Sequence, residues 1–186
     1  MIAEINNPEV LYILAHATEK IVEGELEHLN CRRKISTSKL TYLNVISAKT
    51  AKLFSVATHL GATLNTHIDC MDAMSEYGHH LGIIFQIMDD ILDVEAPETL
   101  GKPQGQDILE GKPTLPLILA YEHATPTDKT QMDALFSKPD TRLTDLQPFL
   151  DKTNALSLSR QEAKISGRLA KDCLLTLPDS PYKQAL

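Results

Sequence analysis

The sequence contains no tryptophan, few aromatic residues and no excess of basic side chains. Its 18 lysines and arginines are outnumbered by 25 aspartates and glutamates, which gives a net charge of −7 at pH 7. A nucleic-acid-binding surface needs basic residues that displace counterions from phosphates, so we expect no nucleic acid among the partners of this protein. The same balance still permits a local basic site for a small anionic ligand.

Cysteines and long apolar runs are also scarce. Cys31, Cys70 and Cys173 lie far apart and form no CxxC pair, which provides neither a disulfide framework nor a zinc site and suits a reducing compartment. No apolar run approaches the roughly 20 residues needed to span a bilayer. Residues 1–7 lack the basic and apolar regions of a signal peptide. We therefore expect a cytoplasmic protein without a stable membrane span.

Strand-like alternation is missing too, because the apolar residues recur at helical spacing along almost the whole chain. Asn7 and the segment 36–38 are N-cap candidates, and Pro8 takes the first helical position after Asn7. Ser180 and Pro181 repeat that arrangement. The 186 residues suffice for one buried domain, and the predicted class is all-α. Helices are expected over residues 8–29, 36–60, 68–93, 114–123, 127–136, 143–152 and 157–175, with a loop over 94–106.

The helix predicted over residues 68–93 contains two glycines, Gly78 and Gly82. In a helix interior each glycine costs up to about 1 kcal/mol relative to alanine. A packing reason, such as the close approach of another helix, is therefore expected at both positions.

The most informative pattern lies near the end of that helix. Gln86, Asp89, Asp90 and Asp93 are three and four residues apart, so they form one polar stripe on a helix that is otherwise apolar. Such a helix is expected inside the protein, with its stripe lining a cavity. Three carboxylates near a helix C-terminus oppose the macrodipole, and they suit Mg²⁺, which takes one or two carboxylates plus ligand phosphates. The alternative is a solvated acidic helix end.

Lysines on two other segments could complete an anion site. Lys49 falls in the middle of an apolar arc on the helix predicted over 36–60, so its ammonium either snorkels to solvent or meets an anion. Lys102 and Lys112 each follow a glycine, where a charged ligand can approach the backbone, although the spacing is not that of a P-loop. Acids that hold Mg²⁺ and lysines that reach the same cavity describe a diphosphate site. The arc consists of Val45, Ile46, Leu53, Val56 and Leu60.

These motifs resemble the second aspartate-rich region of trans-isoprenyl diphosphate synthases. The likeness extends from about Pro8 to Leu186 and is closest to bacterial long-chain members such as the octaprenyl diphosphate synthases. It implies a helical bundle of the isoprenoid synthase type around a central cavity, usually as a homodimer. It also implies a prenyltransferase that adds isopentenyl diphosphate to an allylic diphosphate, for isoprenoid and quinone side chains. The segments that carry it are Lys49-Thr50, Phe85-Gln86-x-x-Asp89-Asp90-x-x-Asp93, Gly101-Lys102 and Gly111-Lys112-Pro113-Thr114-Leu115-Pro116.

The resemblance implies a role for each matched side chain. Three carboxylates would hold Mg²⁺ on the allylic diphosphate, and three lysines would contact that diphosphate. Thr50 and Gln86 would lie beside the developing carbocation and offer it a dipole. The implied metal ligands are Asp89, Asp90 and Asp93, and the implied diphosphate-binding lysines are Lys49, Lys102 and Lys112.

One part of the family pattern has no counterpart in this sequence. The family has a first aspartate-rich motif on a facing helix, followed by arginines, but no DDxxD precedes Lys49, and Arg32 and Arg33 lie in a break between helices. The isopentenyl diphosphate residues and the positions that usually set product length belong to that half. We therefore expect residues 1–186 to be a truncated, C-terminal portion of one synthase domain, without its N-terminal helices and last helix, and inactive alone.

The missing half would leave the apolar faces of residues 45–60 and 83–92 without packing partners. We expect the chain to associate as a homodimer or with a missing N-terminal half. Two other functions stay open: a non-catalytic diphosphate-binding or regulatory subunit of a hetero-oligomer, and a fragment of a class I terpene cyclase. The Gly-Lys segments favour the synthase over the cyclase, as does the lack of an Asn/Ser/Glu metal triplet on a later helix.

Overall fold

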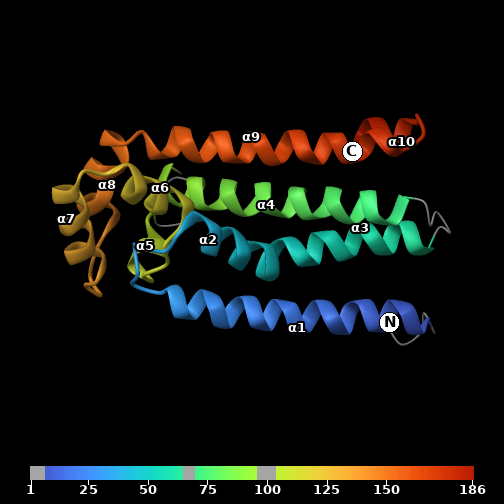
Figure 1. The fold of residues 1–186 in the computed structure, drawn as a ribbon, viewed down its shortest axis with the longest axis horizontal. Helices are drawn as coiled ribbons and strands as arrows, with labels where there is room; N and C mark the ends of the chain where they lie inside the picture. Colours follow the sequence, from blue (N-terminus) through green and yellow to red (C-terminus); the bar gives the residue numbers. More distant parts are fainter. Residues whose placement is uncertain (1–6, 65–69, 96–103) are drawn as a thin grey trace.

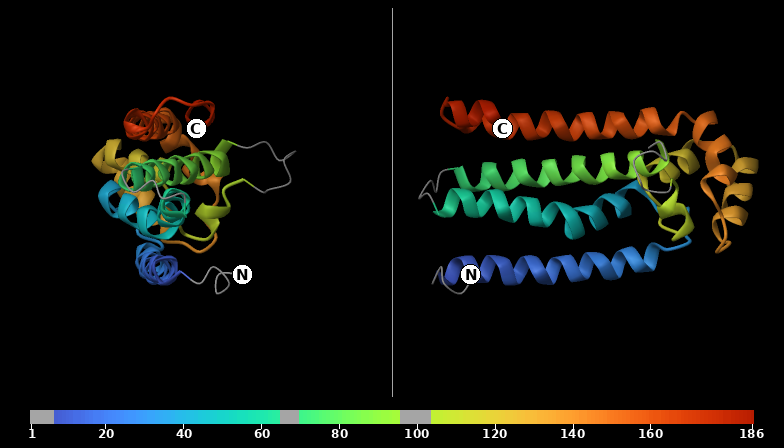
Figure 2. Two further views of the ribbon diagram at one scale, coloured as in Figure 1. Left: turned by 90° about the vertical axis from the view of Figure 1, so that its right-hand side faces the viewer. Right: turned by 180° about the vertical axis from the view of Figure 1, so that it is seen from behind.

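The computed structural model describes residues 7–64, 70–95 and 104–186, and within these ranges every regular element is a helix. The predicted all-α class is therefore confirmed. Four long helices run alongside one another in stacked layers (Figures 1 and 2). They are α1 (Pro8–Cys31), α3 (Lys52–Leu64), α4 (Met71–Glu95) and α9 (Ala155–Cys173).

Short helices close one end of these layers (Figure 1). This end holds α5 (Gln106–Leu109), α6 (Leu115–His123), α7 (Pro126–Phe136) and α8 (Leu143–Lys152), whereas α10 (Pro181–Ala185) lies at the opposite end. None of the helices in the described ranges combines the length and apolar character that crossing a bilayer requires.

The predicted caps form as expected. The Asn7 side chain accepts hydrogen bonds from the backbone N–H groups of Glu9 and Val10, and Ser180 accepts one from Lys183. These bonds satisfy amides that have no partner within the first helical turn. The structure differs from the prediction at both ends of the loop over 94–106. Helix α4 continues to Glu95, and a further short helix, α5, begins at Gln106. Residues 96–103 and the predicted helix start at residue 68 lie outside the described residues.

The second predicted helix runs without a break from Lys39 to Leu64, but it is not α-helical throughout. It consists of α2 (Lys39–Ile46), a π-helical turn over Ser47–Ala51 and α3. The wider turn shifts the helix register, so the predicted apolar arc is wrong at Leu53, which is 56% exposed, although Val56 is buried.

Glycines hold this π-helical turn between two long helices. A Cβ on Gly24 of α1 would lie 2.8 Å from the Cβ of Ala48, and one on Gly82 of α4 would lie 2.5 Å from the Cα of Ala51. A Cβ on Gly78 would lie 2.2 Å from the Thr58 hydroxyl oxygen. The close helix approach predicted at Gly78 and Gly82 is confirmed, and it fixes the turn that carries Lys49 and Thr50.

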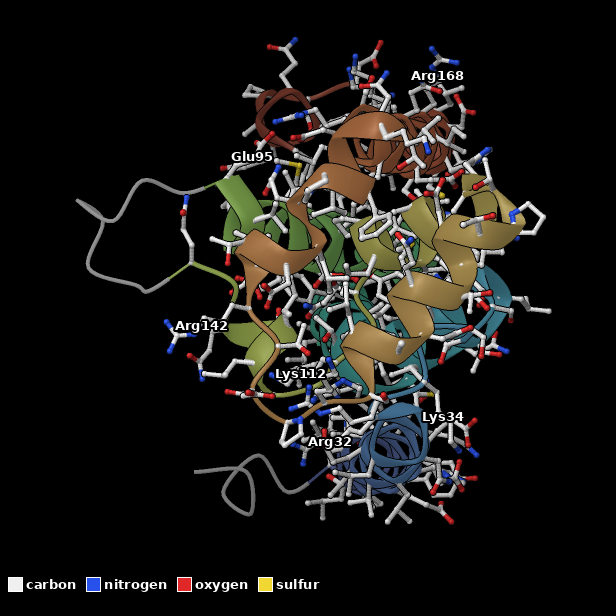
Figure 3. The ribbon with its side chains drawn as sticks, turned by 90° about the vertical axis from the view of Figure 1, so that its left-hand side faces the viewer. Arg32, Lys34, Glu95, Lys112, Arg142 and Arg168 are labelled. Carbon is white, nitrogen blue, oxygen red and sulfur yellow. The ribbon has the colours of Figure 1, made fainter. Side chains whose placement is uncertain are left out.

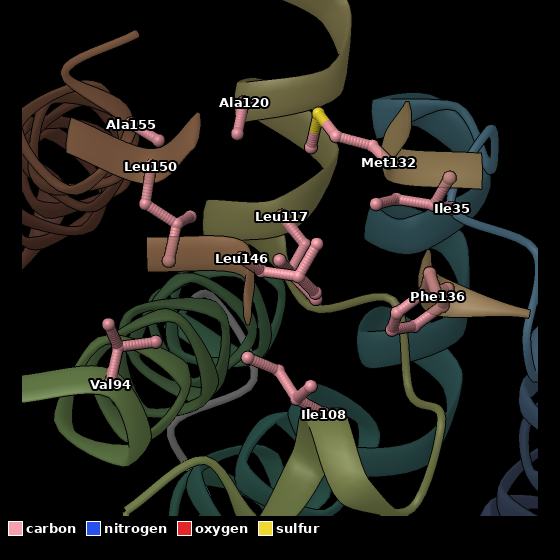
Figure 4. Close-up of a cluster of buried hydrophobic side chains, with 10 residues drawn as sticks. All are labelled: Ile35, Val94, Ile108, Leu117, Ala120, Met132, Phe136, Leu146, Leu150 and Ala155. Atoms are coloured by element: carbon pink, nitrogen blue, oxygen red, sulfur yellow. The ribbon is translucent and has the colours of Figure 1, made fainter. Parts of the chain in front are cut away.

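Two groups of buried side chains support the end of the bundle with the short helices. One lies behind α2 and α4 and includes Tyr42, Ile87 and Ile91. The other fills the space between the short helices, and Ile108 projects into it from α5 (Figure 4). Its members are Ile35, Val94, Ile108, Leu117, Ala120, Met132, Phe136, Leu146, Leu150 and Ala155.

The expectation that α4 lies inside the protein is met on one face only. Ile83, Ile87 and Ile91 are buried, but a stripe on another face is between 37% and 57% exposed. A similar exposed stripe runs along α1. The α4 stripe consists of Leu81, Phe85, Met88 and Leu92, and the α1 stripe consists of Leu11, Val22, Leu26 and Leu29.

Candidate functional site

A cavity of about 220 Å³ lies between α1, α2, the π-helical turn, α4 and the segment that follows α5. Most of the residues singled out from the sequence meet in its walls, although they come from three separate segments. Asp93 is not part of the cavity wall formed by the described residues, and Lys102 lies outside those residues. The predicted residues that line it are Lys49, Thr50, Gln86, Asp89, Asp90 and Lys112.

Asp90 is the buried anchor of this site, with a 2% exposed side chain. The Tyr42 hydroxyl donates to its Oδ2 at 2.6 Å, the Leu115 backbone N–H donates to the same oxygen at 3.2 Å, and the Gln86 amide donates to Oδ1 at 2.9 Å. Burial raises the pKa of Asp90 to about 7, although these hydrogen bonds oppose the rise. Burial together with Asp90 also raises the pKa of Tyr42, which therefore stays a neutral donor.

The hydrogen bonds continue from Asp90 to the π-helical turn. Thr50 Oγ1 donates to Gln86 Oε1 at 3.0 Å, so the amide of Gln86 is held at both its oxygen and its nitrogen. Because both ends are bound, the amide dipole has one orientation at the cavity wall. The turn and α4 are thus connected by a polar chain that begins at Thr50 and ends at Tyr42.

Asp89 lies next to Asp90 in sequence but in a different environment. Its side chain is exposed and lines the cavity. Within the described ranges, no hydrogen bond or ion pair reaches its carboxylate. Both of its oxygens are therefore available to a cation or a donor that enters the cavity.

Asp93 has a third environment. Its Oδ1 accepts a hydrogen bond from the backbone N–H of Gln106 at 3.1 Å, and its Oδ2 accepts one from that of Asp107 at 3.3 Å. The carboxylate thus caps the N-terminus of α5. Burial and the nearby charge of Asp107 raise the pKa of Asp93 to about 6. The single polar stripe read from the sequence is divided by the fold into a buried anchor, an open carboxylate and a helix cap.

Lys49 lies at the edge of the cavity toward α1, and not in the middle of an apolar face. Its Nζ is 2.6 Å from Glu25 Oε2 and 3.0 Å from His28 Nδ1, and its side chain is 36% exposed. The hydrogen bond from Lys49 lowers the pKa of Glu25. Burial and the charge of Lys49 lower the pKa of His28, so the imidazole is neutral and accepts from the ammonium.

Lys112 also lines the cavity and is held in a similar way, at the end of the molecule seen in Figure 3. Its Nζ is 2.9 Å from Asp107 Oδ1 and 2.7 Å from Glu110 Oε2. Partial burial disfavours its charge, but the two carboxylates outweigh burial and raise the pKa of Lys112 above its usual range. Both lysines therefore reach the cavity as ammonium groups paired with carboxylates.

Three further residues shape the site without having been predicted from the sequence: Tyr42, Glu25 and His28. Tyr42 carried a signal, because a tyrosine on an apolar helix face needs a partner for its hydroxyl. Glu25 and His28 carried no such signal in the sequence, because only the packing of α1 against the π-helical turn brings them to Lys49.

Comparison with known proteins adds a second line of evidence. A family model described as polyprenyl synthetase matches residues 1–152. The chain is 34% identical over 190 residues to octaprenyl diphosphate synthase of Haemophilus influenzae and 35% identical over 191 residues to that of Escherichia coli. Another relative, 32% identical over 191 residues, is heptaprenyl diphosphate synthase component 2 of Bacillus subtilis. These alignments cover all of this chain but only 58%, 59% and 54% of the relatives.

Solved structures have the same fold. A polyprenyl synthase from Caulobacter crescentus, complexed with calcium and isoprenyl diphosphate, superimposes with a TM-score of 0.90 at 34% identity. A decaprenyl diphosphate synthase from Rhodobacter capsulatus superimposes with a TM-score of 0.89, also at 34% identity. Each superposition covers 98% of this chain, and 57% and 58% of the respective solved chain. The predicted type of helical bundle is thereby confirmed.

Proposed function

The chain belongs to the polyprenyl synthetase family, and on that premise we propose that it supplies the second aspartate-rich wall of a polyprenyl diphosphate synthase active site. The proposed reaction adds isopentenyl diphosphate to an allylic diphosphate. The family match favours this function over a terpene cyclase. The chain spans a little under 60% of the curated relatives with which it is compared, so the activity of the whole enzyme is part of the proposal.

One observation carries the proposal: a single cavity combines an open carboxylate, a buried hydrogen-bond chain and two ammonium groups. Diphosphate carries several negative charges, and ammonium groups stabilise the charge that grows on it as the allylic C–O bond breaks. Lys49 and Lys112 are the described cations on the cavity rim, and Lys102 is a third by resemblance. To bind phosphate oxygens, the first two would exchange their carboxylate partners for the ligand.

The donor set fits Mg²⁺, which prefers oxygen ligands and uses few protein carboxylates beside phosphates and water. Asp89 is the best placed ligand, because its oxygens have no competing donor among the described residues. Asp90 and Asp93 already accept hydrogen bonds with both oxygens and would contribute through remaining lone pairs. When bound there, Mg²⁺ would act as a Lewis acid toward the diphosphate.

Gln86 and Thr50 are proposed to lie beside the allylic carbocation. The carbonyl oxygen of Gln86 is the negative end of a dipole fixed by Thr50 and Asp90. A fixed dipole stabilises positive charge without acting as a base, so the cation is not deprotonated too early.

We expect the 186-residue chain to bind farnesyl diphosphate more tightly with Mg²⁺ than without it, as measured by calorimetry. Asp89→Ala should weaken the Mg²⁺-dependent binding by about tenfold or more, because it removes the open carboxylate. Asp172→Ala, at an exposed position on α9, is the matched control. Equal binding with and without Mg²⁺, or unchanged binding by Asp89→Ala, would contradict the proposal.

The exposed stripes of α1 and α4 support association. Contiguous apolar surface of this kind usually marks an interface, and we propose that a second copy or an N-terminal half with the first aspartate-rich motif covers it. The name of the Bacillus relative, component 2, supports association with a different subunit. The hetero-oligomeric alternative, in which this chain is a non-catalytic subunit, stays open. Incorporation of labelled isopentenyl diphosphate, with and without an added N-terminal half, separates these cases. We expect no steady turnover by the chain alone.

A further inference from the structure

The segment after α1 interlocks with the turn that leads to Lys112. The Arg33 backbone N–H donates to the carbonyl oxygen of Gly111 at 2.8 Å. Both residues have left-handed backbones, with φ of 60° at Arg33 and 73° at Gly111. A Cβ on Gly111 would lie 2.3 Å from Arg33 Nε, so the guanidinium occupies the space that any larger residue would need.

The Arg33 guanidinium forms hydrogen bonds with the C-terminal ends of two helices. It donates to the carbonyl oxygens of Ile108 and Leu109, at 3.4 and 2.5 Å, where α5 ends. It also donates to those of Lys138 and Pro139, at 2.9 and 3.2 Å, just after α7. Carbonyl groups at a helix C-terminus lack partners within the helix, and a cation at that end also interacts favourably with the helix macrodipole.

The opposite end of α5 is held by a charge of the opposite sign. The carboxylate of Asp93 accepts the first amides of α5, as described above, and the Asp93 carbonyl accepts a hydrogen bond from Gly105 at 2.8 Å. An isolated four-residue helix has little stability, so α5 depends on these two side chains, on Arg32 and on the buried Ile108. Arg32 donates to the carbonyl oxygen of Glu110, the residue after α5, from Nε at 3.1 Å and from Nη2 at 2.7 Å. Arg33 and Asp93 thus fix α5 from its two ends.

The position of Lys112 follows from that of α5. Its backbone N–H donates to the carbonyl oxygen of Asp107 at 2.8 Å, and its ammonium pairs with the Asp107 carboxylate. Arg33 itself is not part of the cavity wall formed by the described residues. A non-glycine residue with positive φ is uncommon, and glycine would fit the backbone at position 33 with less strain. The four hydrogen bonds of the guanidinium explain why arginine is found there instead.

We propose that Arg33 is a positioning residue of the diphosphate site, which acts by holding α5 so that Lys112 faces the cavity. The inference rests on the proposed function, since it assigns Lys112 to the binding of a diphosphate. Removal of the guanidinium should release α5 and lower the affinity for diphosphate. The whole of this loss should come from the displacement of Lys112.

The test measures inorganic pyrophosphate binding with Mg²⁺ by calorimetry. Arg33→Gln should lower the affinity about tenfold in the wild-type background and less than twofold in the Lys112→Gln background, because both variants remove the same contribution. Arg33→Gly removes the guanidinium while it relaxes the backbone, and it should lose as much affinity as Arg33→Gln. Arg142→Gln removes an exposed charge at the same end of the molecule and should bind like wild type.

Hydrogen exchange provides a local readout. In both Arg33 variants the peptide 104–115 should exchange faster, whereas α4 and α9 keep their protection. Wild-type affinity in both Arg33 variants, or an equal loss with and without Lys112, would overturn the inference and leave the proposed function intact. A wild-type chain that fails to bind pyrophosphate would instead overturn the proposed function, and the inference with it.

Discussion

The two sides of the cavity are built from different kinds of interaction. On one side, Asp90 is buried and receives three hydrogen bonds from neutral donors, and glycine contacts hold the turn behind it. On the other side, Lys49 and Lys112 are partly exposed and paired with carboxylates. Hydrogen bonds in a low-dielectric interior are costly to break, whereas ion pairs in contact with water are worth little. The first side therefore sets the geometry, and the second can exchange its partners for a ligand.

The largest effect should come from the close helix contact behind the buried side. In Gly78→Ala, the new methyl group would meet the Thr58 hydroxyl at 2.2 Å and the Phe54 carbonyl oxygen at 2.5 Å. We expect the free energy of unfolding in urea to fall by about 2–3 kcal/mol, as in other overpacked interiors. Gly167→Ala is the control, because its methyl group would lie 3.9 Å from Ile84, an ordinary contact. Equal stability of the two variants would show that α3 and α4 are not tightly packed at Gly78.

A smaller effect should appear in the pH dependence of stability. The pKa of Asp90 is about 7 in the folded chain against 3.8 for a free aspartate, so folding favours its protonated form. Stability from this group is fully present below pH 4 and is lost as the pH rises toward and through 7. Asp93, with a pKa of about 6, acts in the same direction.

Urea unfolding at pH 5 and pH 8 measures this difference, and Asp90→Asn should reduce it. The amide cannot ionise, so only the contribution of Asp93 and other groups would remain. Asp93→Asn, which changes the half-buried cap, is the comparison and should reduce the difference less. An unchanged pH dependence in Asp90→Asn would show that the buried carboxylate is not the titrating group.

The smallest effect on stability should come from the exposed side. Lys49→Gln should change the free energy of unfolding by less than about 0.5 kcal/mol, because the Glu25 that it leaves is 46% exposed. The same variant should weaken pyrophosphate binding with Mg²⁺ severalfold. Lys20→Gln removes an exposed ion pair with Glu23 elsewhere on α1 and serves as the control. A loss of stability above about 1 kcal/mol in Lys49→Gln would place Lys49 among the structural groups.

Local pattern was sufficient for most of the helices. Asn7 and Ser180 mark helix starts by a side-chain oxygen that reaches its own chain, and this chemistry is independent of the rest of the fold. Gly78 and Gly82 indicated a close contact because glycine is otherwise unfavourable in a helix. The helix α5 was missed, since its four residues depend on Asp93 and Arg33, which lie 13 and 73 residues before its first residue.

The sequence by itself determined the all-α class, the helix starts and the set of side chains that could serve a diphosphate site, because each depends on residue type and spacing along one chain. Only the tertiary structure decided what each of these side chains does. Three aspartates on one stripe became a buried anchor, an open carboxylate and a helix cap, since Tyr42, the cavity and α5 lie at different points along that stripe. Likewise, Lys49 was directed to Glu25 by a π-helical turn that no local pattern signalled. Burial and charge pairing depend on which segments meet in space, and the order of residues along one helix does not contain that information.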